Sequence, residues 1–175
     1  MSHDNVLSMM KYYDMHNRQD DNVKVIFLPC YLDGKDGIVN MTYYDIVLGN
    51  DLCVYPSYYE PWGYTPLEAV AFKVPCITTD LAGFGLWANS EFGGRYGEIE
   101  DGVKVIHRTD YNYSEVADAI KDTVAKFSNM SQKEVDACRK KADALSKKAL
   151  WSEFIKFYHE AYDIALRKAE ERIAK

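Results

Sequence analysis

The sequence lacks the marks of several large classes of protein. Its 175 residues contain no apolar run that approaches the length of a membrane span, and no charged N-terminal segment precedes an apolar one as in an export signal. Basic residues number 21 against 27 acidic ones, a net charge of -6 that disfavours a surface for nucleic acid. We therefore expect a cytoplasmic protein with neither a membrane nor a nucleic acid as partner.

Patterns of metal-binding and nucleophilic residues are also lacking. The four cysteines show no close metal spacing, and the four histidines have no partner at a spacing typical of a zinc site or a catalytic triad. Free thiols fit a reducing cytoplasm. We expect no metal and no cofactor, and we interpret the histidines as structural or surface residues. The residues concerned are Cys30, Cys53, Cys76, Cys138, His3, His16, His107 and His159.

What is present is a globular composition in which short apolar runs alternate with helix-forming segments. The composition is 47% hydrophobic and 27% charged, which excludes a disordered chain. Buried strands are predicted at 23–29, 52–56, 76–79 and 103–107, and helices at 5–16, 43–49, 66–74, 84–90 and 114–127. This order predicts an α/β fold with a doubly wound, Rossmann-like parallel sheet that binds ligands at the carboxyl ends of its strands.

Long C-terminal helices are expected from about residue 131. Ser131 and Glu134 have the spacing of a capping box, and the helical composition then continues almost to Lys175. We expect a break at 150–152, where an aromatic stretch begins that includes Trp151 and Tyr162. These aromatics fit either a stripe facing the core of this domain or a contact with another domain. We count residues 1–175 as one domain.

The segment 55–68 reads YPSYYEPWGYTPLE and predicts a loop that leads from a strand into a helix. Thr65 suits the N-cap and Pro66 the first helical position. The free amides of such a helix start, together with the positive end of its dipole, form a site for phosphate oxygens, and Gly63 allows close approach. Glu68 fits two roles, a capping box with Thr65 or a ligand contact.

Glu60 lies in the loop itself, between Tyr59 and Pro61, with no basic partner in the surrounding sequence. A carboxylate gains little from burial among apolar side chains, so a functional role is favoured. Near a reacting anomeric carbon, such a group stabilises positive charge that develops in the transition state.

The segment 55–68, with the later TTDLAGFG of 78–85, resembles the glycogen synthases of animals and fungi. These are retaining glycosyltransferases with two facing Rossmann-like domains, the GT-B fold, and this chain resembles the C-terminal, nucleotide-sugar-binding one. The resemblance implies that Glu60 is catalytic and that Glu68 lies at the ribose of the donor. It also implies that the diphosphate is held at Gly63, Tyr64 and Thr65. By the same resemblance Tyr43 stacks on the base, and Gly83 to Gly85 form a tight turn beside the site.

The implied reaction is transfer of glucose from UDP-glucose or ADP-glucose to the non-reducing end of an α-1,4-glucan, with retention. The acceptor would bind to an N-terminal domain outside this sequence, so we expect the isolated chain to be inactive. A retaining enzyme with another acceptor and a non-catalytic nucleotide-sugar-binding module stay open as alternatives. A homo-oligomer also stays open. The family's arginine cluster for glucose 6-phosphate is replaced here by Arg139, Lys140 and Lys141, which we interpret as a solvated basic patch.

Overall fold

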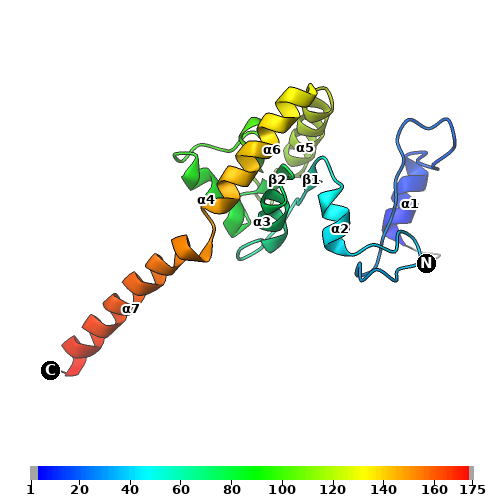
Figure 1. Ribbon diagram of the computed structural model, residues 1–175. Coiled ribbons are helices and arrows are strands. Elements are labelled where there is room, and N and C mark those ends of the chain that lie inside the picture. Colours follow the sequence, from blue (N-terminus) through cyan, green and yellow to red (C-terminus); the bar gives the residue numbers. More distant parts are fainter. Residues whose placement is uncertain (1–3, 174–175) are drawn as a thin grey trace. The chain divides into compact units, whose positions relative to one another are not determined.

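The structure is a computed structural model that describes residues 4–173 (Figure 1). The chain divides into two compact units, one that ends at Tyr43 and one that begins at Tyr44, and each is described by itself. The expected count of one domain for residues 1–175 therefore stays a prediction. His3, interpreted above as a structural or surface residue, lies outside the described residues.

The first unit begins with helix α1 (Asn5–Tyr12). The carboxylate of Asp4 caps it by accepting hydrogen bonds from the amides of Val6 at 2.9 Å and Leu7 at 3.0 Å. We expected this helix to continue to His16, which is wrong. Asp14 has a φ of +57°, a left-handed conformation that an α-helix does not contain, so the helix ends before it.

The segment 23–29 is not a strand, and the prediction of a buried strand there is wrong. A strand needs a neighbouring strand to pair its backbone groups. Here the side-chain amide of Asn17 takes both backbone groups of Val25, with bonds of 2.8 Å to its N–H and 2.7 Å to its carbonyl. Val23 and Ile26 are each 66% exposed, so the segment buries little apolar surface.

The second unit is built on a parallel sheet of three strands in the order β1-β2-β3. The strands are β1 (Cys53–Val54), β2 (Cys76–Thr79) and β3 (Val103–Ile106). All four residues of the central strand β2 are buried, as expected for a strand covered on both faces. The other three predicted strands are thus confirmed, and so is the α/β class with a parallel sheet.

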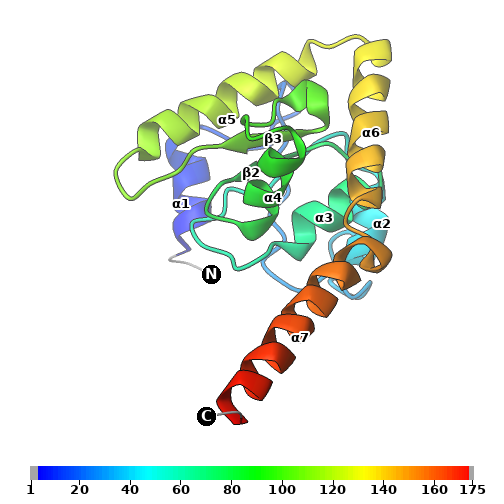
Figure 2. The same cartoon turned by 90° about the vertical axis from the view of Figure 1, so that its left-hand side faces the viewer.

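Helices cover both faces of this sheet. Ile106 packs with Val116 of α5 (Tyr113–Ser128) on one face, whereas the preceding Val105 lies beside Gly85 of α4 (Gly83–Glu91) on the other. Successive side chains of a strand point to opposite faces, so α5 and α4 must lie on opposite sides. Figure 2 shows this arrangement, with the strands between α5 and α4. The remaining elements are α2 (Tyr43–Leu48), α3 (Tyr64–Ala71), α4 (Gly83–Glu91), η1 (Ile99–Asp101), α5 (Tyr113–Ser128), α6 (Gln132–Lys147) and α7 (Trp151–Ile173).

Helix α6 begins as the sequence predicts, because Ser131 and Glu134 form a reciprocal capping box. The prediction of a solvated basic patch further along α6 is wrong for Arg139. Its guanidinium donates to the carboxylate of Asp51 at 2.8 Å and to the carbonyls of Asn50 at 3.3 Å and Lys73 at 3.5 Å. Arg139 therefore ties α6 to the segment that enters β1.

Helix α7 begins at Trp151, which confirms the expected break, but its aromatic stripe does not form part of a core. Phe154 packs against Trp62 and Trp87, with ring centroids 5.7 and 5.9 Å apart. Trp151 and Tyr162 are 59% and 57% exposed, and no described residue of α7 is buried. Figure 2 shows the reason, since α7 extends away from the sheet beyond its first turns. Within residues 4–173, no helix is long and apolar enough to cross a membrane.

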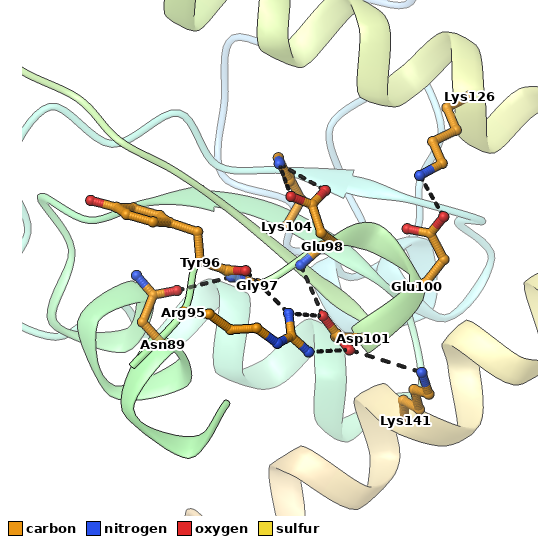
Figure 3. A network of polar contacts seen from close by, with 10 residues as sticks. All are labelled: Asn89, Arg95, Tyr96, Gly97, Glu98, Glu100, Asp101, Lys104, Lys126 and Lys141. Atoms are coloured by element: carbon orange, nitrogen blue, oxygen red, sulfur yellow. Dashed lines mark hydrogen bonds and ion pairs between the residues drawn. The ribbon is translucent and has the colours of Figure 1, made fainter. Parts of the chain in front are cut away.

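Charged side chains connect the helices around η1 (Figure 3). Arg95 donates two hydrogen bonds to Asp101, at 2.7 and 2.8 Å, and Lys141 of α6 lies 3.9 Å from the same carboxylate. The hydrogen bond from Arg95 lowers the pKa of Asp101, against an opposing effect of burial. Lys126 of α5 pairs with Glu100. The network thus fixes η1 to α5 and α6 at one end of the sheet.

Gly102, between η1 and β3, has no room for a side chain. Its φ is +87°, and a Cβ there would lie 2.4 Å from the backbone nitrogen of Ala142 in α6. We expect Gly102→Ala to lower the free energy of unfolding by about 2 to 5 kcal/mol, through a left-handed conformation and overpacking. Denaturant unfolding of the chain measures this.

The matched control is Gly94→Ala, because Gly94 has a φ of +84° but an added methyl group there would meet nothing within 4 Å. Gly94→Ala should lower the free energy of unfolding by only about 1 to 2 kcal/mol, the cost of the left-handed conformation alone. Equal losses for the two variants would contradict the close packing of α6 on Gly102.

Candidate active site

The candidate site lies at the carboxyl edge of the sheet, where ligands bind in open α/β folds. Three segments meet there: the loop that follows β1, the residues Asp80 to Ala82 after β2, and His107 after β3. The loop after β1 carries the motif singled out in the sequence. Its backbone is bound to the segment after β2, so the two form one edge.

Glu60 is held by its backbone. Its N–H donates to the carbonyl of Leu81 at 3.1 Å, and its carbonyl accepts from the N–H of Gly83 at 3.1 Å. The side chain is half-buried, and Ser57 Oγ lies 3.4 Å from its Oε2. Among the described residues, no lysine, arginine or histidine forms an ion pair with Glu60. The structure thus presents a carboxylate on a fixed backbone, with no ion-pair partner among the described residues.

Helix α3 starts two residues earlier than predicted. Its N-cap is Gly63, with a φ of +104°, so Thr65 is the second helical residue and Pro66 the third. The assignment of Thr65 as N-cap is therefore wrong. Glycine adopts the left-handed conformation without strain, which allows the chain to enter the helix at Tyr64. Pro66 is tolerated because the amides of the first turn have no partner within the helix.

The first turn of α3 still offers an anion site. In any α-helix the first amides point outward at the positive end of the dipole, and here these belong to Gly63, Tyr64 and Thr65. Tyr64 is 70% exposed, so this end of the helix is open to a ligand. Binding of the diphosphate at these three residues stays a prediction.

Glu68 does not form a capping box, so that alternative is wrong. It is the fifth residue of α3, and its Oε1 accepts a hydrogen bond of 3.1 Å from the hydroxyl of Tyr44 in α2. The ring of Tyr44 also packs against Phe72, with centroids 5.6 Å apart. The carboxylate is therefore positioned by a side chain that the sequence did not connect with it.

Tyr43 is the last residue of the first unit and the first residue of α2. Its N–H donates to the carbonyl of Leu32 at 3.1 Å, within that unit. Glu60, Gly63, Tyr64, Thr65 and Glu68 all lie in the second unit. These five residues therefore lie in one stretch of the second unit, and the stacking role of Tyr43 stays a prediction.

Gly83 and Gly85 lie within α4 rather than in a tight turn, which corrects that expectation. A Cβ on Gly83 would lie 2.2 Å from the carbonyl oxygen of Pro61, and one on Gly85 would lie 2.1 Å from that of Thr79. Both glycines are thus required for close approach of backbones. Gly83 in particular lets α4 contact the loop that carries Glu60.

Sequence reasoning missed a cluster of polar side chains at this edge, which we call the Asp80 cluster: Asp80, Tyr96, His107 and Arg108. Asp80 Oδ2 lies 2.6 Å from His107 Nδ1 and accepts from the Tyr96 hydroxyl at 2.9 Å, and Oδ1 accepts from the Arg108 N–H at 2.9 Å. His107 is thus part of a polar cluster. The position of polar residues directly after two buried strands was the available signal.

The charge of Asp80 is stabilised by these partners. Burial raises the pKa of the carboxyl group, but the hydrogen bonds from His107, from the Arg108 amide and from Tyr96 outweigh it and lower the pKa. In turn, the hydrogen bond to Asp80 raises the pKa of Tyr96. Asp80 is therefore a carboxylate at neutral pH. The described residues contain no group of three or more His, Cys, Asp or Glu that could hold a metal ion.

Comparison with known proteins identifies the family of this chain. The family model for glycogen synthase matches residues 1–173. The chain is 31% identical over 169 residues to glycogen [starch] synthase isoform 1 of Saccharomyces cerevisiae, covering 96% of this chain and 24% of that protein. It is 30% identical over 176 residues to glycogen [starch] synthase of Caenorhabditis elegans, covering 98% of this chain and 25% of that protein.

A mammalian relative gives the same result. The chain is 29% identical over 168 residues to the liver glycogen [starch] synthase of Rattus norvegicus, covering 96% of this chain and 23% of that protein. The chain thus spans about a quarter of the length of the curated relatives that it matches. Since the family model covers nearly every residue, the chain belongs to the glycogen synthase family.

Proposed function

We propose that this chain forms the nucleotide-sugar-binding part of a cytoplasmic enzyme that transfers glucose from a nucleotide-glucose to the non-reducing end of an α-1,4-glucan, with retention. The observation that carries the proposal is Glu60, a half-buried carboxylate with a fixed backbone, three residues before the N-cap of α3. Family membership supports the same reaction.

In this proposal the first turn of α3 holds the diphosphate of the donor. The amides of Gly63, Tyr64 and Thr65 donate to phosphate oxygens, and the helix dipole favours their negative charge. Such a site needs no metal ion of its own. Glu68, oriented by the Tyr44 hydroxyl at 3.1 Å, accepts hydrogen bonds from ribose hydroxyls.

Glu60 is the catalytic residue of the proposal. As the bond from glucose to the diphosphate breaks, positive charge develops at the anomeric carbon, and a nearby carboxylate stabilises it. The diphosphate departs toward the amides of α3, which stabilise the negative charge of the leaving group. One carboxylate and one anion site thus act on opposite charges of the same transition state.

We propose further that the acceptor binds to residues outside this chain, because the chain spans about a quarter of the length of its relatives. The chain alone would then hold one side of an active site and show no turnover. Two other functions compete: a retaining transferase with another acceptor, and a binding module without catalysis. The unneutralised Glu60 favours an enzyme over the module, because an uncompensated carboxylate beside an anion site would weaken simple anion binding.

The first experiment replaces Glu60 by glutamine in the full-length protein. We expect the rate of glucose transfer to fall at least about a hundredfold, the scale of losing one electrostatic contact in a transition state. Affinity for the donor should change little. The control is Glu115→Gln, on the exposed first turn of α5. Steady-state kinetics with near-normal turnover for Glu60→Gln would remove it from the catalytic role.

A second experiment tests the base. Tyr43→Ala should weaken binding of uridine diphosphate to the full-length protein by about 1 to 3 kcal/mol, the scale for one stacked base. Tyr44→Phe removes only the hydroxyl bonded to Glu68. Because a single hydrogen bond contributes about 1 kcal/mol, this variant should weaken binding less than Tyr43→Ala does. Calorimetry that gave the reverse order would exclude stacking on Tyr43.

A third experiment concerns glucose 6-phosphate. A phosphate dianion needs several guanidinium groups on one face, whereas Arg139 is bound to Asp51 and Lys141 lies 3.9 Å from Asp101. We expect the full-length enzyme to be active without this effector. Glucose 6-phosphate should raise its initial rate less than about threefold, since a tenfold increase requires about 1.4 kcal/mol of coupling free energy. Initial rates across effector concentrations decide this, and strong saturable activation would contradict it.

A further inference from the structure

The side chain of Arg108 crosses the carboxyl edge of the sheet. Arg108 follows the end of β3, yet its Nη1 donates a hydrogen bond of 2.7 Å to the carbonyl of Pro56, in the loop after β1. The strands β1 and β3 are not neighbours, because β2 lies between them. The guanidinium also lies over the ring of Tyr58, 5.1 Å from its centroid, in a cation–π contact.

Arg108 is itself held in place by Asp80. The N–H of Arg108 donates to Asp80 Oδ1 at 2.9 Å, while Oδ2 is occupied by Tyr96 and His107. Only 10% of the Asp80 side chain is exposed, whereas that of His107 is 60% exposed. A buried carboxylate with three hydrogen-bonding partners has little freedom to move, so the backbone of Arg108 starts from a fixed point.

The loop from Pro56 to Glu60 is therefore restrained at both of its ends. Arg108 binds its first residue, and the hydroxyl of Thr79 donates to the carbonyl of Ser57 at 2.7 Å. At the far end, Glu60 exchanges backbone hydrogen bonds with Leu81 and Gly83. Thr79, Leu81 and Gly83 all belong to β2 and the segment after it. The segment after β3 contributes Arg108 and also Asp110, whose carboxylate accepts a hydrogen bond from the Tyr58 hydroxyl.

We propose that Arg108 is a positioning residue for glucose transfer, which sets the place of the Glu60 carboxylate by holding Pro56 and Tyr58, with Asp80 holding Arg108. The inference rests on the proposed function of Glu60. Misplacement of a reacting group by about 1 Å can cost on the order of a hundredfold in rate, so a restraint four residues away has a measurable effect. Arg108 acts through Glu60 and is not itself in contact with the reacting atoms.

The test uses the full-length protein, with each kcat referred to the folded fraction. Arg108→Gln should lower kcat about tenfold and leave the donor KM within about twofold, because the loop moves while the anion site at α3 stays. Arg108→Lys should return kcat to within about threefold of wild type, since its ammonium can still donate to the Pro56 carbonyl. Tyr58→Leu keeps Arg108 but removes the ring beneath its guanidinium and the hydroxyl that donates to Asp110, and it should lower kcat about threefold.

The matched control is Arg139→Gln. The Arg139 guanidinium also binds a backbone carbonyl, that of Asn50 at 3.3 Å, but this residue precedes β1 and so lies at the opposite edge of the sheet. Its loss should lower the free energy of unfolding and leave kcat within about twofold, because it does not touch the loop from Pro56 to Glu60.

A double variant separates positioning from general damage. In the Glu60→Gln background, Arg108→Gln should lower kcat by less than about twofold, since residues that act as a unit are not additive. A further tenfold loss there would overturn the inference, and so would a raised donor KM with normal kcat, which indicates direct contact with the donor. If Glu60→Gln collapses turnover while Arg108→Gln leaves it unchanged, only the inference fails. Near-normal turnover of Glu60→Gln overturns the proposed function and the inference together.

Discussion

The backbone bridge between Glu60 and Ala82 joins the two parts of the candidate site. It pairs the loop after β1 with the segment after β2, with hydrogen bonds of 3.1 Å on either side. The bridge exists because Gly83 has no side chain, since a Cβ there would lie 2.2 Å from the carbonyl oxygen of Pro61. The absence of a side chain at Gly83 thus allows the loop of Glu60 to lie directly on the start of α4.

The three-stranded sheet turns this local contact into a site. Parallel strands place their carboxyl ends at one edge, so residues far apart in sequence come together there. The Nη1 of Arg108 thus lies 2.7 Å from the carbonyl oxygen of Pro56. At the same edge, Asp80 gathers Tyr96, His107 and the Arg108 amide around one carboxylate. The candidate site is therefore a set of strand ends whose residues bind one another.

The contacts that hold α6 lie apart from the candidate site in this unit. Around η1, the ion pair of Asp101 with Lys141 and the close packing of Gly102 on Ala142 hold α6 to the core. Among the described residues, no hydrogen bond or ion pair joins Asp101 or Lys141 to the loop from Pro56 to Glu60. Near the start of α7, the ring of Phe154 packs against Trp62, two residues after Glu60, and against Trp87 of α4. The exposed remainder of the aromatic stripe of α7 extends beyond the sheet.

The sequence by itself determined the three strands, the helices after them and the stretch that carries Glu60, because buried strands and helix starts follow from local patterns of side chains. Tertiary structure decided the rest. Gly63 replaced Thr65 as N-cap, Tyr44 engaged Glu68, and residues 23–29 did not form a strand. These outcomes, like the Asp80 cluster, depend on which distant groups meet, and a ladder or a hydrogen bond forms only when both partners are in place.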